Sequence, residues 1–351
     1  MELSSIKIGN RKVGENEPTY IIAELSGNHN MSKERALELV RSAKKCGADA
    51  VKLQTYKADT MTLDISKDEF LINENGSLWE GKSLYELYEE AHTPWDWHED
   101  IFNLAKELKI DCFSSPFDET AVDFLEDLDV PCYKIASFEN TDIPLIRKIS
   151  STGKPVIMST GMASLKELAT SIEELKLYGC KEIILLKCTS AYPAKAKDAN
   201  MLMIPKLRKI FDLNVGLSDH SMGNTVALVA TSLGAVVIEK HFTLDRRDGG
   251  VDSAFSMDPA ELKELVSEVK KAKSSLGTGE FSLSDEEKKS RKYRRSIYIT
   301  KDLNEGEVLS TNNVKVIRPS LGLSPIYLEN ILGKKVNKNL KRGAPLSWDD
   351  F

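Results

Sequence analysis

Eight short apolar runs, each followed by a helix-like segment, constrain the fold of this chain more than any other feature of its sequence. The runs are rich in β-branched residues, and the segments between them repeat apolar residues at helical spacing. The predicted strands are 20–23, 50–53, 111–113, 132–136, 155–158, 183–186, 214–217 and 236–238. The predicted helices include 32–46, 95–108, 118–128, 164–178, 205–211, 224–233 and 259–275. This alternation predicts an α/β fold, a closed (β/α)8 TIM barrel, with an open doubly wound sheet as the alternative.

Polar side chains recur where each predicted strand ends. In chain order they are Glu24; Lys52 and Gln54; Ser114 and Ser115; Lys134 and Ser137; Ser159 and Thr160; Lys187 and Thr189; Asp219 and His220; Glu239 and His241. The C-terminal ends of barrel strands form the active-site face of this fold. Each lysine alone would suit a solvated surface. Three at equivalent ends, beside the backbone amides of the turn at Gly161, predict a pocket for phosphate and carboxylate groups.

Two of the five histidines, His220 and His241, follow consecutive predicted strands, 214–217 and 236–238. Parallel neighbours in a βαβ unit bring these ends side by side, about one strand spacing apart. Neutral imidazoles so placed predict a shared divalent cation, and the alternative is a pair of structural histidines bonded to nearby backbone. Asp219 and Glu239 are candidates for supporting partners or for a further ligand.

The composition indicates an ordinary globular protein. Of the 351 residues, 41% are hydrophobic, which is enough for a large core. The longest nearly apolar stretch, 226–238, is too short to span a bilayer, and no basic start precedes an apolar run at the N-terminus, so we expect a cytoplasmic protein. The five cysteines show no CxxC spacing, which favours reduced, buried thiols.

The chain divides into a large and a small predicted domain. A hairpin within 1–18 opens a barrel domain that extends to 278, a polar linker covers 279–292, and a small domain covers 293–351. That small domain holds ten Lys or Arg against six Asp or Glu, a net charge of +4, whereas the whole chain carries −6. The basic residues are not dense or interleaved with aromatics, so no nucleic-acid partner is expected. A small domain of this size predicts docking on another surface.

Two connections are longer than the regular pattern requires. The segment 56–93 carries several aromatics and is either a lid over the barrel mouth or a packed excursion without ligand contact. The loop 243–257 follows the second histidine strand. Its Asp252 is a candidate partner for a sugar hydroxyl, with a solvated carboxylate as the alternative.

Six motifs in their order along the chain resemble the sialic acid synthase family. They are AELSGNHN at 23–30, VKLQT at 51–55, KIAS at 134–137, STGM at 159–162, GLSDH at 216–220 and EKHFT at 239–243. The tail, with RRS at 294–296 and RP at 318–319, resembles that family's antifreeze-like (SAF, β-clip) domain. The resemblance implies an enzyme that condenses phosphoenolpyruvate with an N-acylated aminosugar to make a nonulosonic acid, with C–O cleavage of phosphoenolpyruvate.

The resemblance also implies roles for individual residues. The metal ligands would be His220 and His241, holding Mn2+, with Mg2+ or Co2+ as substitutes. Glu24 would be a proton donor or hydroxyl anchor beside the sugar carbonyl. Phosphoenolpyruvate would be held by Lys52, Lys134, Ser137, Ser159, Gly161 and Ser190. The candidate sugar contacts are Gln54, Glu139, Tyr192, Asp252 and Arg318.

Two segments, 25–27 and 79–97, most resemble the branch of the family that makes pseudaminic acid from 2,4-diacetamido-2,4,6-trideoxy-L-altrose. The C6 methyl of that sugar needs an apolar contact. The branch that makes N-acetylneuraminate usually has Ile-Gly after the glutamate and asparagine in place of Ser190, whereas legionaminic acid synthases, whose sugar is also a 6-deoxy diacetamido compound, are the nearer alternative.

Arg318 implies a domain-swapped homodimer, because in the family the matching arginine reaches the partner's barrel and contacts the sugar's acyl group. A surface salt bridge is the alternative for a single arginine.

Two other functions compete with the family's reaction. One is a metal-dependent phosphoenolpyruvate aldolase acting on a sugar phosphate, for which no additional basic cluster is evident. The other is a non-catalytic carbohydrate- or ice-binding protein, which would not need two histidines beside an anion pocket.

Overall fold

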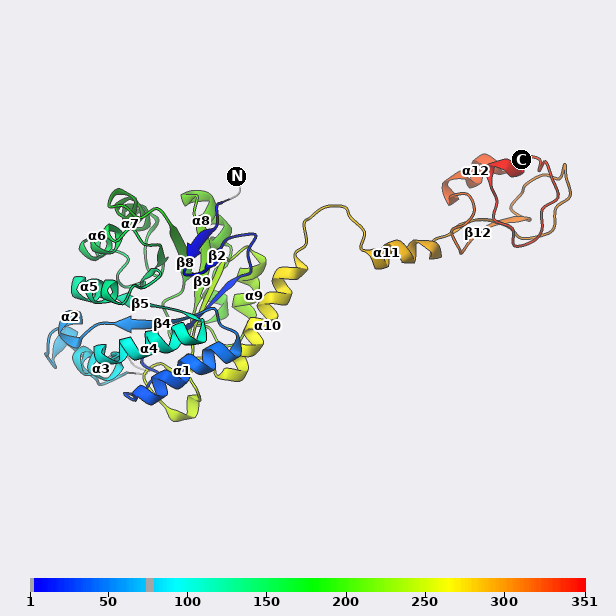
Figure 1. The fold of residues 1–351 in the computed structure, drawn as a ribbon. Coiled ribbons are helices and arrows are strands. Elements are labelled where there is room, and N and C mark those ends of the chain that lie inside the picture. Colours follow the sequence, from blue (N-terminus) through cyan, green and yellow to red (C-terminus); the bar gives the residue numbers. More distant parts are fainter. Residues whose placement is uncertain (1–2, 74–78) are drawn as a thin grey trace. The chain divides into compact units, whose positions relative to one another are not determined.

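The computed structural model describes residues 3–73 and 79–351, and it divides them into two compact units with the boundary between Leu276 and Gly277. The first unit contains a closed barrel of eight parallel strands in the order β10-β3-β4-β5-β6-β7-β8-β9 (Figure 1). The closed TIM barrel predicted from the alternation is therefore confirmed, and the open sheet is excluded. The strands are β3 (Tyr20–Glu24), β4 (Ala50–Thr55), β5 (Asp111–Pro116), β6 (Tyr133–Ile135), β7 (Val156–Ser159), β8 (Ile183–Cys188), β9 (Asn214–Asp219) and β10 (Val237–His241).

Helices follow the strands on the outside of the barrel, and all but α10 (Pro259–Ser275) lead into the next strand. Serine and aspartate side chains begin several of them by accepting backbone hydrogen bonds, as Ser32 does from Arg35 and Asp258 from Glu261. The helices are α1 (Lys33–Cys46), α4 (Trp95–Leu108), α5 (Glu119–Asp127), α6 (Ile143–Ser151), α7 (Leu165–Leu177), α8 (Met203–Phe211), α9 (Thr225–Ser232) and α10 (Pro259–Ser275). Their buried faces pack on the outward residues of the strands, for example Leu39 and Val40 of α1 against Ile21 and Ala23.

Alternate residues of each strand point into the barrel. On β3, Tyr20 and Ile22 belong to a cluster inside the barrel, whereas Ile21 and Ala23 belong to the larger core beneath the helices. The N-terminal hairpin, β1 (Ile6–Ile8) and β2 (Arg11–Val13), adds Ile6, Ile8 and Val13 to the inner cluster. The N-terminal end of the barrel is therefore filled with apolar side chains and closed by the hairpin.

The long connection between β4 and α4 is more ordered than the sequence suggested. It contains α2 (Ala58–Met61), the short 3-10 helix Asp68–Phe70 and α3 (Leu84–Ala91), which begins at a capping box between Ser83 and Glu86. Residues 74–78 of this predicted lid segment lie outside the described residues. No helix among the residues that the structure describes is long and apolar enough to cross a membrane.

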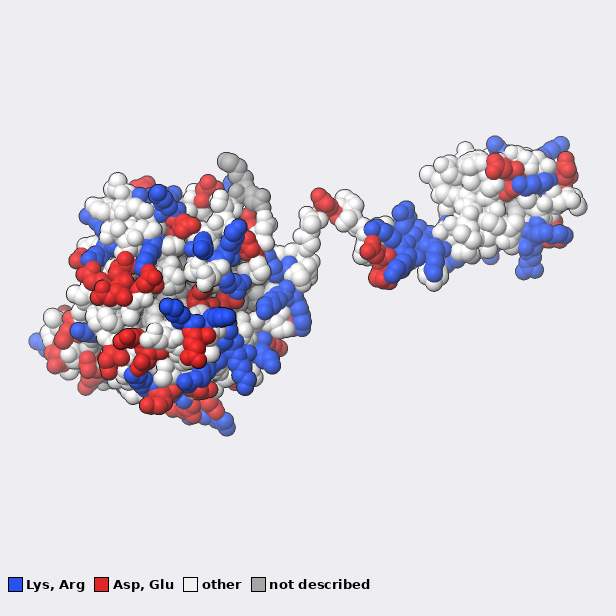
Figure 2. Space-filling view, in the orientation of Figure 1, with Lys and Arg blue, Asp and Glu red and all other residues white. Residues whose placement is uncertain are grey.

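The second unit has its own small core around an antiparallel pair, β11 (Ser296–Ile299) and β12 (Val314–Ile317). The core also includes α12 (Leu328–Ile331) through Ile331. The stretch expected to be a linker, 279–292, contains a short exposed helix, α11 (Asp285–Ser290). Figure 2 shows basic side chains gathered around α11, where Lys288, Lys289, Arg291 and Lys292 follow one another closely.

Candidate active site

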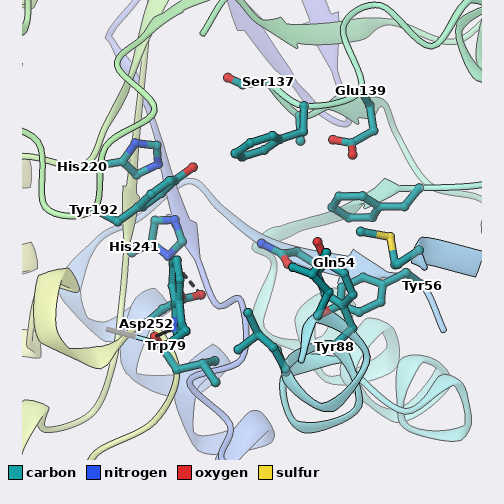
Figure 3. Close-up of a pocket in the computed structure, with 18 of the residues that line it drawn as sticks. Gln54, Tyr56, Trp79, Tyr88, Ser137, Glu139, Tyr192, His220, His241 and Asp252 are labelled. Atoms are coloured by element: carbon teal, nitrogen blue, oxygen red, sulfur yellow. Dashed lines mark hydrogen bonds and ion pairs between the residues drawn. The ribbon is translucent and has the colours of Figure 1, made fainter. Parts of the chain in front are cut away.

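A cavity of about 510 Å³ lies inside the barrel and is lined by residues that end the strands (Figure 3). The residues at the bottom of this cavity are those that point into the barrel at the strand ends, because alternate residues of each strand point inward. Above Tyr20 and Ile22 the next inward residue of β3 is Glu24, and its register partners are Lys52 on β4 and His241 on β10. Inward positions thus change from apolar to charged within a single layer. Charged side chains are costly to bury inside a barrel. A buried layer of them above apolar residues therefore indicates a functional site rather than a stabilising core.

Lys52 is the centre of this charged layer. It is 4% exposed, and its Nζ lies 2.6 Å from Glu24 Oε2 and 3.6 Å from Glu239 Oε2. Burial by itself would lower the pKa of Lys52, but the carboxylates of Glu239 and Glu24 outweigh it and raise that pKa. Burial raises the pKa of Glu24 to about 6 despite the opposing effect of Lys52. Gln54 donates to Glu24 Oε1 at 2.9 Å, which fixes the orientation of this carboxyl group.

Lys134 lies in the same layer with fewer charged partners. It is 1% exposed, and its Nζ donates to Ser159 Oγ at 2.6 Å and to the carbonyl of Ile135 at 2.8 Å. Burial lowers the pKa of Lys134 to about 8. Glu239 has its own pKa lowered, since the ammonium groups of Lys52 and Lys134 outweigh the effect of burial. The site therefore offers two lysines to an anion.

A small cradle of serines lies next to Lys134. The backbone N–H of Gly161 donates to Ser137 Oγ at 3.2 Å. A Cβ atom at position 161 would collide with the hydroxyl oxygens of both Ser190 and Ser137, so only glycine lets the three groups approach. Ser137, Ser159 and the two ammonium groups line the cavity and are donors that suit phosphate and carboxylate oxygens, whereas Gly161 and Ser190 lie behind Ser137 and are not among the described lining residues.

His220 and His241 face each other across the neighbouring strand ends, with ring centroids 5.3 Å apart (Figure 3). Nδ1 of His220 lies 3.0 Å from the carbonyl of Thr189, so this nitrogen carries the proton and Nε2 has a free lone pair. Nδ1 of His241 is buried and has no hydrogen-bond partner among the described residues. Burial, followed by the proximity of His220, holds the pKa of His241 well below its usual value, which keeps the imidazole neutral.

This pair fits two positions of a divalent metal site, because imidazole nitrogens with an available lone pair are good ligands for such ions. Within residues 3–73 and 79–351, no three His, Cys, Asp or Glu side chains are grouped closely enough to hold a metal by themselves. Glu239 and Asp219 therefore do not complete a ligand set. The remaining ligands of a bound ion would be water or substrate oxygens.

Two predictions from the strand ends are wrong, and alternation explains both. Asp219 points away from the cavity and accepts from Lys240 Nζ at 3.0 Å, in a buried pair that also holds the carbonyls of Ser221 and Gly223. Lys187 donates to Thr189 Oγ1 at 2.7 Å and is not among the described residues that line the cavity. Its neighbour Cys188 faces inward instead, so two lysines rather than three converge.

Four of the predicted sugar contacts, Gln54, Glu139, Tyr192 and Asp252, line the cavity (Figure 3). Burial raises the pKa of Glu139 to about 7, and its Oε2 has no hydrogen-bond partner among the described residues. Asp252 accepts from Ser26 Oγ, and its carboxylate lies 3.8 Å from His241 Nδ1, beyond hydrogen-bond distance. Arg318 follows β12 in the second unit, and its role stays a prediction.

The sequence did not reveal the apolar side of the cavity. Residues of α3 and its flanks contribute most of it, which favours the lid interpretation of segment 56–93. The apolar lining residues are Tyr56, Met61, Leu71, Ile72, Trp79, Leu84, Leu87, Tyr88, Ala91, Phe117, Phe138 and Val251. The i, i+3, i+4, i+7 spacing of 84, 87, 88 and 91 was a detectable helical signal, but such a face is more often core than ligand contact.

The fold and the cavity define the class of protein: an enzyme built on a (β/α)8 barrel, with an anion cradle and a histidine pair at the C-terminal ends of its strands. Residues 39–281 match the NeuB family and residues 294–351 match the SAF domain. The chain belongs to the NeuB family of sialic acid synthases, whose members condense phosphoenolpyruvate with a sugar, and the resemblance found in its motifs is confirmed.

Relatives within the family are similar over nearly the whole chain. A pseudaminic acid synthase of Campylobacter jejuni is 45% identical over 346 residues, 99% of this chain and 100% of the relative. A pseudaminic acid synthase of Helicobacter pylori is 46% identical over 336 residues, 95% of this chain and 98% of the relative. The crystal structure of an N-acetylneuraminic acid synthetase from Leptospira borgpetersenii, in complex with citrate, is 31% identical with a TM-score of 0.74, covering 82% of this chain and 96% of that one.

Proposed function

We propose that this enzyme condenses phosphoenolpyruvate with 2,4-diacetamido-2,4,6-trideoxy-L-altrose and water, giving pseudaminic acid and phosphate. The observation that carries the proposal is one cavity in which Lys52, Lys134 and the serine cradle adjoin His220 and His241. A phosphorylated enol and an aldehyde sugar need these two sets of groups side by side. The full-length similarity to two pseudaminic acid synthases supports this choice of sugar.

The residues at the cradle hold phosphoenolpyruvate. Lys52 and Lys134 pair with its phosphate and carboxylate, and Ser137, Ser159 and the Gly161 amide, with Ser190 beside them, donate to the remaining oxygens. In this arrangement the methylene carbon of the enol faces the sugar. Holding both reactants in one orientation converts a bimolecular step into an effectively unimolecular one.

A divalent cation, Mn2+ with Mg2+ or Co2+ as substitutes, would be held by His220 and His241. When bound, it supplies Lewis-acid polarisation of the sugar's aldehyde oxygen. Glu24, whose pKa of about 6 lies close to neutrality, gives a proton to that oxygen as the new carbon–carbon bond forms. Water then adds at C2 of the former enol, and the C–O bond to phosphate breaks, releasing inorganic phosphate.

Gln54, Glu139, Tyr192 and Asp252 contact the sugar hydroxyl and acetamido groups. Arg318 reaches the acyl group of a sugar bound in the partner subunit, within a domain-swapped homodimer in the cytoplasm, where phosphoenolpyruvate is made. Replacing Arg318 by alanine should raise KM for the sugar far more than KM for phosphoenolpyruvate. An equal effect on both substrates would contradict this placement.

The test of the function is phosphate release in the presence of Mn2+ and phosphoenolpyruvate. Three sugars are compared: the altro-configured 6-deoxy diacetamido sugar, its legionaminic counterpart and N-acetylmannosamine. We expect turnover with the first sugar and its loss in His220→Ala. Preference for another sugar would retain the family's reaction and overturn the proposed substrate. Sugar binding without phosphate release from any of the three would favour a carbohydrate-binding protein.

A further inference from the structure

The histidines and a group of tyrosines border the cavity at different places. His220 and His241 lie on one side, and Tyr56 and Tyr88 lie on the opposite side, with Gln54 nearer to the tyrosines (Figure 3). The tyrosine rings meet edge to face at 5.7 Å, and Tyr56 meets Phe117 in the same way at 5.2 Å. We call this side, with the face of α3 described next, the apolar wall.

Helix α3 supplies the wall with four residues on one helical face. Leu84, Leu87, Tyr88 and Ala91 are spaced i, i+3, i+4, i+7, and all four line the cavity. A surface helix normally turns such a face toward the core. Here the face borders a cavity whose other side carries the reactive groups, so it is placed to contact a ligand.

The wall is held in position before any ligand binds. The capping box of Ser83 and Glu86 fixes the start of α3. Trp79, just before the helix, donates from Nε1 to the carbonyl of Val251 at 2.9 Å and so ties this segment to the loop after β10. Gly27, in the turn after β3, permits a close approach to the same loop, because a Cβ there would collide with Val251 and press on Ala91. A preorganised wall can discriminate between ligands.

The position of the wall indicates which part of a sugar meets it. In the proposed reaction C1 of the open-chain sugar reacts beside the histidines, so C6, at the other end of the chain, extends toward the opposite side. The polar groups nearby are Gln54, Glu139 and the hydroxyls of Tyr56 and Tyr88. A hydroxyl at C6 that faced the leucine and alanine side chains of α3 would be desolvated without a hydrogen-bond partner, whereas a methyl group there would make favourable apolar contacts. The wall therefore suits a 6-deoxy sugar.

We propose that the face of α3 formed by Leu84, Leu87, Tyr88 and Ala91, together with Tyr56 and Phe117, is the subsite for the C6 methyl group and selects against sugars with a C6 hydroxyl. The inference rests on the proposed function and adds the residues that set its specificity. Apolar pockets reject an added hydroxyl by up to about 100-fold in kcat/KM, so the selection is expected to lie between about tenfold and 100-fold.

The test compares kcat/KM for two sugars that differ at one atom: 2,4-diacetamido-2,4,6-trideoxy-L-altrose and its counterpart with a C6 hydroxyl. Leu84→Gln adds an amide to the wall, and Leu177→Gln makes the same change at an exposed leucine, 75% accessible, at the end of α7. We expect the wild type and Leu177→Gln to share the preference for the 6-deoxy sugar, and Leu84→Gln to reduce it about tenfold. The ratio of kcat/KM for the two sugars is measured on one preparation of each variant. A smaller fraction of folded protein lowers both values equally and leaves the ratio unchanged.

The outcomes separate the subsite from the reaction itself. A wild-type ratio close to one, or an unchanged ratio in Leu84→Gln, overturns the wall as a specificity element while the synthase reaction stands. A reduced ratio in both variants also overturns it, since the effect would then not come from the wall. Absence of phosphate release with either sugar overturns the proposed function, and the subsite with it.

Discussion

Replacing Lys134 by methionine tests whether the buried lysine serves ligand binding or stability. Lys134 is 1% exposed, and its Nζ donates to Ser159 Oγ and to the carbonyl of Ile135. No carboxylate of the described residues lies within ion-pair distance of this Nζ. Burial lowers the pKa of Lys134 to about 8, so the charged form is disfavoured in the empty cavity. Methionine keeps the length and removes the charge. The free energy of unfolding should therefore stay the same or increase.

Binding of phosphoenolpyruvate should weaken strongly in Lys134→Met. A hydrogen bond to a charged group contributes about 1.5 to 3 kcal/mol. That corresponds to a loss of roughly 10-fold to 150-fold in affinity. The assay is calorimetric titration of phosphoenolpyruvate into the Mn2+-loaded enzyme without sugar, with thermal unfolding measured in parallel.

Lys187→Met is the matched control, because this lysine also ends a strand but bonds to Thr189 outside the cavity. Lys187 is partly buried but does not line the cavity, so its replacement should leave the affinity for phosphoenolpyruvate within about twofold. Two results would refute the reasoning. One is an equal loss of affinity in both variants. The other is a Lys134→Met protein that unfolds more easily yet binds phosphoenolpyruvate normally.

Four further predictions follow from the structure. Because the pKa of Lys134 is about 8, KM for phosphoenolpyruvate should rise as the pH increases through 8; a flat profile to pH 9.5 would contradict the role. Since its pKa is lower in the folded than in the unfolded chain, this lysine also makes stability increase with pH between about 8 and 10.5, a slope that Lys134→Met should remove from urea unfolding curves. His220→Ala should abolish Mn2+ binding in electron paramagnetic resonance titrations, whereas the surface variant Leu177→Gln should bind Mn2+ normally. Ile8→Ala, at the closed end of the barrel, should lower the free energy of unfolding by about 2 to 5 kcal/mol and leave kcat of the folded enzyme unchanged, which unfolding and active-site-normalised rates would check.

The sequence was sufficient for the barrel because its signals are local. Helix α10 begins at Pro259 after an aspartate cap and ends at Ser275, as its apolar spacing predicts. Strand β10 was placed at 236–238, but pairing with β3 extends it to His241. That extension depends on a neighbour far away in the sequence, so the strand alone could not reveal it.

The direction of each side chain at a strand end was the harder question. Cys188 and Lys187 are adjacent on β8, and only the register of the closed barrel decides that the cysteine faces the cavity and the lysine does not. Lys187 was predicted to face the anion pocket only because it is a charged residue at the end of a strand. The apolar wall was missed for the opposite reason, because the face of α3 has the same spacing as a helix that packs on a core. Residue type and helical spacing identify an apolar helix face. Whether that face packs on a core or borders a cavity depends on the tertiary structure.

The hairpin closes the N-terminal end of the barrel, and this affects the side from which a substrate can reach the cavity. Ile8 and its neighbours fill that end together with Tyr20 and Phe113, whereas the cavity is lined by residues at the C-terminal ends of the strands. In the proposed reaction both substrates would therefore reach the cavity from the side that α3 borders. Initial rates with both substrates varied would show whether phosphoenolpyruvate, held by Lys52 and Lys134, must bind before the sugar.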